Sequence, residues 1–118
     1  MRKTLPILSA ILILSQGCYN DNVEELYEFE DPNCDTLDVS FSNQVFPIIQ
    51  GNCSITGCHV AGGNGMLLEN YNNVKAYVDN GTMFDRVVNT QDMPPSQPLT
   101  SCQIDQIDSW INAGAPNN

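Results

Sequence analysis

The chain has 118 residues, of which 42% are hydrophobic and 15% charged. These values are typical of one small globular domain and exclude a coiled coil or a wholly disordered chain. The 4 Lys and Arg residues stand against 14 Asp and Glu residues, for a net charge of −10. Nucleic-acid binding and attachment to anionic lipid both need clustered basic side chains. The charge therefore argues against both classes of protein.

The N-terminal 17 residues have the pattern of an export signal. Arg2 and Lys3 precede an apolar run over residues 5–14, and ten helical residues rise about 15 Å, half of a hydrocarbon layer of about 30 Å. A run of this length indicates a cleaved signal and not a membrane-spanning helix. It ends at Leu14-Ser-Gln-Gly-Cys18, which resembles the bacterial lipobox, where the cysteine becomes the lipid-bearing N-terminus.

We therefore predict a signal peptide over residues 1–17, an acidic tether over 18–33 and a folded domain over 34–118. The protein is then an exported lipoprotein that faces the periplasm or the cell surface, held to the membrane by a lipid on Cys18. The alternative is an ordinary cleaved signal that leaves Cys18 as a spare thiol.

Two helices are expected in the first half of the domain. Ser42 is a capping residue for a helix that ends near Asn52, and Pro47 lies just past its first turn, which predicts a kink or a late start. Asn70 caps a second helix over residues 71–79, and Gly81 follows its end. Residues 84–88 are ambiguous between a strand and a helical turn, and residues 89–98 are expected to form an extended loop.

The last helix has the clearest boundaries. Thr100-Ser-Cys-Gln103 matches a capping box, and Gly114 and Pro116 end the helix. An apolar stripe follows from Ile104, Ile107 and Ile111, with Trp110 at its edge. The sequence therefore predicts a small all-α domain of about three short helices with long loops. Such a core is thin, and we expect something besides side chains to fill it.

The five cysteines divide into three groups. An exported chain folds where thiols form disulfides or are consumed by chemistry. With Cys18 lipidated, and with Cys53 and Cys58 in one short segment, Cys34 and Cys102 remain. We predict a disulfide between them, which would stabilise the fold by about 4 kcal/mol on the chain-entropy model.

The segment Cys53-Ser-Ile-Thr-Gly-Cys58-His59 resembles the attachment signature of c-type haem, Cys-x-x-Cys-His. In that signature two thiols add to the haem vinyl groups and the adjacent histidine binds the iron, because fixing the second sulfur also places the imidazole. The step from Cys58 to His59 is intact, but the spacer has four residues instead of two. The extra residues are expected to bulge outward, for which Ser54, Thr56 and Gly57 are suited.

A second axial ligand for the iron cannot be a histidine, since His59 is the only one in the chain. Met93 is the natural candidate, because the prolines around it can present a thioether at small entropic cost. Met66 and Met83 are competitors. Met66 is expected to line the pocket, and Met83 follows Gly81 without a rigid frame.

From Val45 to Pro116 the chain resembles small bacterial c-type cytochrome domains of the planctomycete-type cytochrome c family. The matching segments follow in order: Pro47-Ile-Ile49, Cys58-His59, Gly65-Met-Leu-Leu68, Met93-Pro-Pro95 and Trp110 to Pro116. The resemblance implies a cytochrome c-like fold around one covalent haem c, with Cys53 and Cys58 as anchors and His59 and Met93 as axial ligands. It implies electron transfer with redox partner proteins and no catalysis on the iron.

Three other interpretations stay open at this stage. Cys53 and Cys58 could form a local disulfide in a haem-free lipoprotein that acts as an interaction module. A zinc ion could be held by Cys53, Cys58, His59 and one of the remaining cysteines. A haem sensor or a peroxidase-like enzyme would leave the sixth iron position open, without Met93.

Overall fold

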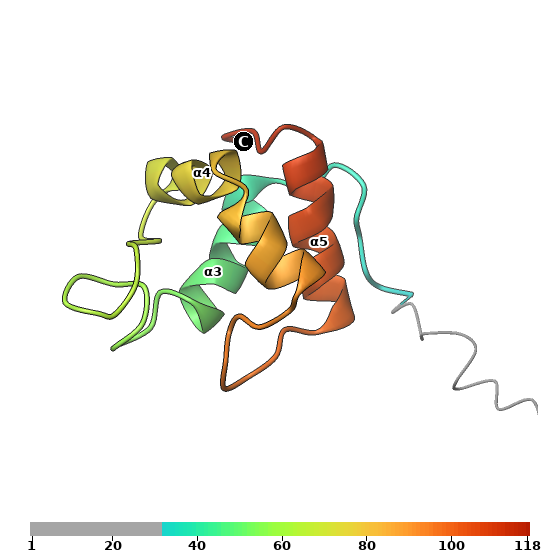
Figure 1. The fold of residues 1–118 in the computed structure, drawn as a ribbon. Helices are drawn as coiled ribbons and strands as arrows, with labels where there is room; N and C mark the ends of the chain where they lie inside the picture. The colour runs from blue at the N-terminus through green and yellow to red at the C-terminus, as the bar shows by residue number, and fades with distance from the viewer. Residues whose placement is uncertain (1–31) are drawn as a thin grey trace, which may run out of the picture.

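The computed structural model describes residues 32–118, and this part of the chain is all-α, as predicted, with no strand. The elements follow in the order η1 (Phe41–Val45), α3 (Phe46–Asn52), α4 (Tyr71–Asp79), η2 (Phe84–Asn89) and α5 (Ser101–Asn112). Figure 1 shows these helices gathered into one body, with the loops after α3 and after η2 extending from the same end. The predicted signal peptide, Cys18 and nearly all of the tether lie outside the described residues.

The first helical segment begins earlier than the sequence predicts. Ser40, and not Ser42, is its cap: the Ser40 side chain accepts a hydrogen bond from the Asn43 amide at 3.1 Å. The chain then winds as a wide π-helical turn through Val45 before the regular helix α3 begins at Phe46. Pro47 lies in the first turn of α3, where no intrahelical donor is needed. The helical segment therefore does not start late, and Pro47 lies just after the point where the π-helical turn gives way to the regular helix α3.

Helix α4 agrees with the sequence at both ends. The Asn70 side chain accepts from the Asn73 amide at 3.1 Å, and the helix ends at Asp79. Residues 84–88, which the sequence left ambiguous, are helical. The π-helix η2 begins at Phe84, and the Thr90 amide just after it bonds to the Asp85 carbonyl. Residues 90–100 have no regular structure, as expected for the proline-rich loop.

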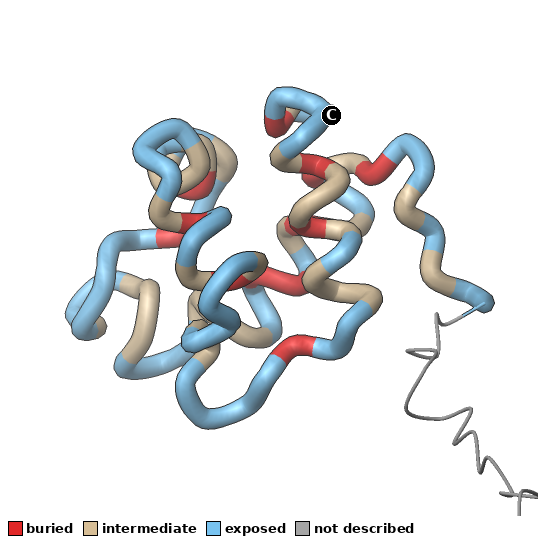
Figure 2. The backbone as a smooth tube through the Cα atoms, turned by 45° about the vertical axis from the view of Figure 1, so that its right-hand side comes forward, coloured by how far each residue is buried: buried red, intermediate tan, exposed pale blue. Residues whose placement is uncertain are grey.

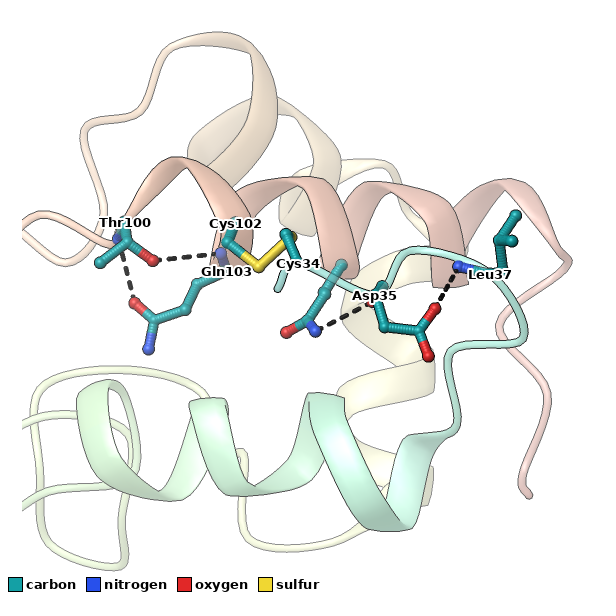
Figure 3. The surroundings of a disulfide bond; sticks show 7 residues. Cys34, Asp35, Leu37, Thr100, Cys102 and Gln103 are labelled. Atoms are coloured by element: carbon teal, nitrogen blue, oxygen red, sulfur yellow. Dashed lines mark hydrogen bonds between the residues drawn. A yellow bond between two sulfur atoms is a disulfide. The ribbon is translucent and has the colours of Figure 1, made fainter. Parts of the chain in front are cut away.

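Helix α5 has both halves of the predicted capping box. Thr100 accepts from the Gln103 amide at 3.2 Å, and Gln103 accepts from the Thr100 amide at 3.0 Å. Figure 3 shows this pair of bonds at the start of the helix. The helix ends where predicted, with Gly114 in a left-handed conformation just beyond it.

The core is built around Trp110, which is fully buried. The sequence predicted this residue at the edge of the apolar stripe of α5, whereas it lies at the centre of the core. Its indole Nε1 donates to the Pro116 carbonyl at 2.9 Å, so the C-terminal segment folds back over α5. Phe41 packs on the indole with ring centroids 5.5 Å apart. Figure 2 shows the buried positions concentrated on the inward sides of the helices, while the loops are mostly exposed. The helices therefore share one small apolar core.

Cys34 and Cys102 are joined by a disulfide, with their Cα atoms 5.6 Å apart. The bond ties the segment before η1 to the first turn of α5, as Figure 3 shows. The Gln106 side chain adds a hydrogen bond to the Asp35 carbonyl at 3.0 Å. The N-terminal segment is thereby fixed along α5. Among the residues that the structure describes, no helix is long and apolar enough to cross a membrane.

Candidate functional site

Four residues singled out from the sequence line one cavity. Cys53, Cys58 and His59 come from the segment after α3, and Met93 comes from the loop after η2. The cavity has a volume of about 260 Å³. This is slightly below the range of about 300–1,000 Å³ for clefts that bind cofactors and other small molecules. The remaining lining residues are Asn52, Ile55, Gly57, Asn64, Gly65, Pro94, Pro95 and Ser96.

The cysteine segment is folded tightly against the end of α3. The Cys53 amide bonds to the Ile49 carbonyl at 2.8 Å, and the Cys53 carbonyl accepts from the His59 amide at 3.1 Å. This closes the four-residue spacer into a loop that returns to its starting point. Ile55, Thr56 and Gly57 are exposed, as the extra length of the spacer predicts. Ser54 does not join them, because its hydroxyl turns inward and donates to the Leu68 carbonyl at 2.8 Å.

The imidazole of His59 is held by backbone. Its Nδ1 lies 2.7 Å from the Met66 carbonyl oxygen, and because a carbonyl can only accept, Nδ1 carries the proton of the neutral ring. Nε2 is then unprotonated and has a free lone pair for a metal. The ring also contacts Tyr77 edge-on, with centroids 6.0 Å apart. Sequence analysis expected Met66 to line the pocket, whereas its side chain is exposed and its carbonyl makes the useful contact.

Gly65 and Gly63 make room for this arrangement. A Cβ on Gly65 would lie 2.5 Å from His59 Nδ1 and 2.6 Å from Cε1, and a Cβ on Gly63 would overlap the Cys58 carbonyl. Contacts this short are not tolerated, and neither the ring nor the backbone can yield without moving the site. The two glycines therefore provide clearance for His59 and for the backbone of Cys58.

Cys53 and Cys58 are free thiols and do not form the local disulfide of the haem-free alternative. Burial, and to a smaller extent the nearby Cys58, raise the pKa of the Cys53 thiol to about 11. Cys53 is therefore a neutral thiol at physiological pH. A zinc site would need Cys34 or Cys102 as the fourth ligand, but these are bonded to each other. No group of three or more metal-ligating side chains of the His, Cys, Asp or Glu type is found among residues 32–118.

Of the three methionines in the domain, Met93 is the one placed to serve the main cavity. It lines that cavity and also a smaller one of about 50 Å³, and both cavities share Cys53 and His59. Met83 lines only the smaller of the two cavities and is part of the core, at 3% exposed. The structure therefore brings Met93 together with the cysteines and His59 from 34 residues away in the sequence.

The donor set fits a c-type haem. Two cysteines, one histidine and one methionine line a shared cavity, and none of the described residues that line it is an Asp, Glu, Lys or Arg. Such a lining suits the apolar face of a porphyrin. Comparisons with protein-family models, curated proteins and solved structures found no match. The function is therefore inferred from the geometry of these residues.

Proposed function

We propose that the protein is an exported, lipid-anchored monohaem c-type cytochrome that carries single electrons between redox partner proteins outside the cytoplasm. The observation that carries this proposal is the meeting of Cys53, Cys58, His59 and Met93 around one cavity. The sequence pattern alone also points to these four residues. The family resemblance to planctomycete-type cytochromes c belongs to the same proposal.

Each residue has a distinct part in holding the haem. Cys53 and Cys58 would hold its vinyl groups as thioethers, and His59 Nε2 and the Met93 sulfur would bind the iron. When bound, the haem supplies an iron that changes between the ferrous and ferric states and so carries one electron. The Nδ1 proton of His59, donated to the Met66 carbonyl, fixes the ring and increases the basicity of Nε2.

The ligand types favour electron transfer over chemistry on a substrate. A thioether ligand raises the reduction potential relative to a second histidine. With two protein ligands on the iron, no coordination position is left for a substrate. The chain also has no second histidine to act as a general base. Cys34 and Cys102 stabilise the domain and take no part in the site.

The experiment that tests the proposal is a redox titration of the protein purified from the exported route, followed by absorbance. We expect one reversible one-electron transition. Replacing Met93 with Ala should lower the potential and change the oxidised spectrum. An unchanged spectrum and potential in M93A would favour the open-coordination sensor or peroxidase instead. A wild-type protein with no haem absorbance would overturn the proposal in favour of the interaction module.

A further inference from the structure

The loop that presents Met93 returns onto the helix that precedes it. After η2 the chain reverses direction at Gln91, which has a left-handed φ of 52°. The carbonyl of Arg86 then accepts two hydrogen bonds, from the Asp92 amide at 3.1 Å and from the Met93 amide at 3.2 Å. The last turn of a helix leaves carbonyls without intrahelical partners. Here one such carbonyl binds the backbone of the proposed ligand itself.

The side chain of Arg86 contacts the same loop a second time. Its Nε donates to Asp92 Oδ1 at 2.6 Å, a charge-assisted bond. The Arg86 and Asp92 side chains are 41% and 50% exposed, and ion pairs this exposed add little to global stability. The pair is better suited to fixing one local geometry than to stabilising the fold. The side-chain bond to Asp92 raises the pKa of Arg86, and the same bond lowers the pKa of Asp92.

Arg86 also reaches the site. It lines the smaller cavity together with Cys53, His59 and Met93. One residue therefore contacts the loop through its carbonyl, contacts it again through its guanidinium, and borders the space into which the loop delivers a side chain. The other cation of the described domain, Lys75, forms its ion pair with Asp79 within α4 and lines neither of the two cavities described here.

We propose that Arg86 is a positioning residue for Met93: through Asp92 and through its own carbonyl it holds the loop so that the thioether stays at the iron. This inference rests on the proposed function, since it assigns a role in the ligation of the haem. Loss of the hydrogen bond from the Arg86 side chain to Asp92 is expected to raise the fraction of molecules in which Met93 is dissociated from the iron.

The test compares Arg86→Ala with Lys75→Ala in the haem-loaded protein, because each variant removes one ion-paired cation. Imidazole added to the ferric protein competes with Met93 for the iron, so its apparent affinity reports the fraction of dissociated Met93. We expect R86A to bind imidazole about 3- to 10-fold more tightly than wild type, as the loss of one exposed hydrogen bond of ordinary net strength predicts. K75A should bind it as wild type does, and M93A sets the upper limit. Equal affinities in R86A and K75A would overturn the inference.

Two further measurements separate positioning from general damage. A double-mutant cycle with Asp92→Ala should be non-additive, with the double variant no worse than R86A, because both changes remove one contact. Arg86→Lys, which keeps the charge, should recover part of the wild-type affinity. Additive effects or no recovery would overturn the pairing.

A readout without haem distinguishes failure of this inference from failure of the proposed function. Hydrogen exchange at the Met93 amide should be faster in R86A than in wild type and unchanged in K75A. We expect this result both in the haem-loaded protein and in the haem-free chain. Unchanged exchange in R86A overturns the inference alone. A wild-type protein that never carries haem overturns the proposed function, and with it the role of Arg86 in ligation.

Discussion

The carbonyl oxygen of Met66 lies 2.7 Å from Nδ1 of His59. This contact decides which nitrogen of the neutral ring keeps a free lone pair, because the proton resides on the nitrogen that donates. Gly65 precedes Met66 and leaves the space that the ring occupies. Gly65 and Met66 therefore determine the position and the tautomer of the single histidine, Gly65 through the space it leaves and Met66 through its backbone carbonyl.

Replacing Gly65 with Ala should displace the His59 ring, because the new Cβ would lie 2.5 Å from Nδ1. We expect G65A to carry less haem, with an altered axial ligand spectrum, measured as absorbance per mole of protein. Gly51→Ala is the matched control. Nothing lies within 4 Å of a Cβ at Gly51, and Ala favours a helix over Gly by about 1 kcal/mol. Haem content as high in G65A as in G51A would contradict this prediction.

Removing the Cys34–Cys102 disulfide should lower stability and leave the site intact. The bond closes a loop over a sequence separation of 68 residues, for which loss of the cross-link costs about 2–4 kcal/mol. The double variant C34S/C102S should therefore unfold at lower denaturant concentration. Its haem spectrum and potential, measured in the folded protein, should match wild type. A changed potential would mean that the bond shapes the site directly.

The pKa of about 11 for Cys53 predicts slow alkylation of this thiol in haem-free chain. In a variant with Cys18 and Cys58 replaced by Ser, Cys53 is the one remaining free thiol. Burial is the larger cause of the raised pKa and remains in this variant, whereas the smaller effect of Cys58 is lost. The pKa of Cys53 therefore stays above its ordinary value of 9.0, and less thiolate is present at pH 8 than in the unfolded chain. We expect slower alkylation than for the same chain in denaturant.

The pH dependence of the alkylation rate shows the direction in which the pKa of Cys53 is shifted. A raised pKa means that the rate in the folded variant goes on increasing above pH 9, the ordinary pKa of the thiol, and levels off at a higher pH than in denaturant. In denaturant it should level off near pH 9. Two profiles that level off at the same pH would show that burial does not protect Cys53.

Thr100→Ala should destabilise the domain by about 1 kcal/mol, as loss of a helix N-cap typically does. Thr100 accepts from the Gln103 amide at the start of α5, and α5 carries the buried Trp110. Thermal unfolding gives the shift. Thr100→Ser is the control, because its hydroxyl keeps the acceptor. An equal loss in both variants would argue that the methyl group and not the cap stabilises the helix.

The sequence predicts best what depends on local chemistry. The capping box at Thr100, the Asn70 cap of α4 and the pairing of Cys34 with Cys102 follow from residue type and position alone. The predicted start of the first helix was wrong, because Ser40 and Ser42 are equally suitable caps by residue type. The choice between them depends on the π-helical turn that packs Phe41 into the core.

The site was predictable in its side chains and not in its backbone. Cysteine, histidine and methionine carry a chemical signature, so pattern identifies them. The carbonyls of Met66 and Arg86 carry none, since every residue has a carbonyl, and their use depends on how the loops fold back. Met66 is the instructive case. It was expected to line the pocket, but its side chain is exposed and its backbone oxygen contacts His59.

The most direct test of the central claim is mass spectrometry of the peptide that contains Cys53, Cys58 and His59, taken from protein purified through its export route. The account predicts one haem attached to this peptide through both sulfurs. A peptide without haem, with the two cysteines joined to each other or free, would contradict it.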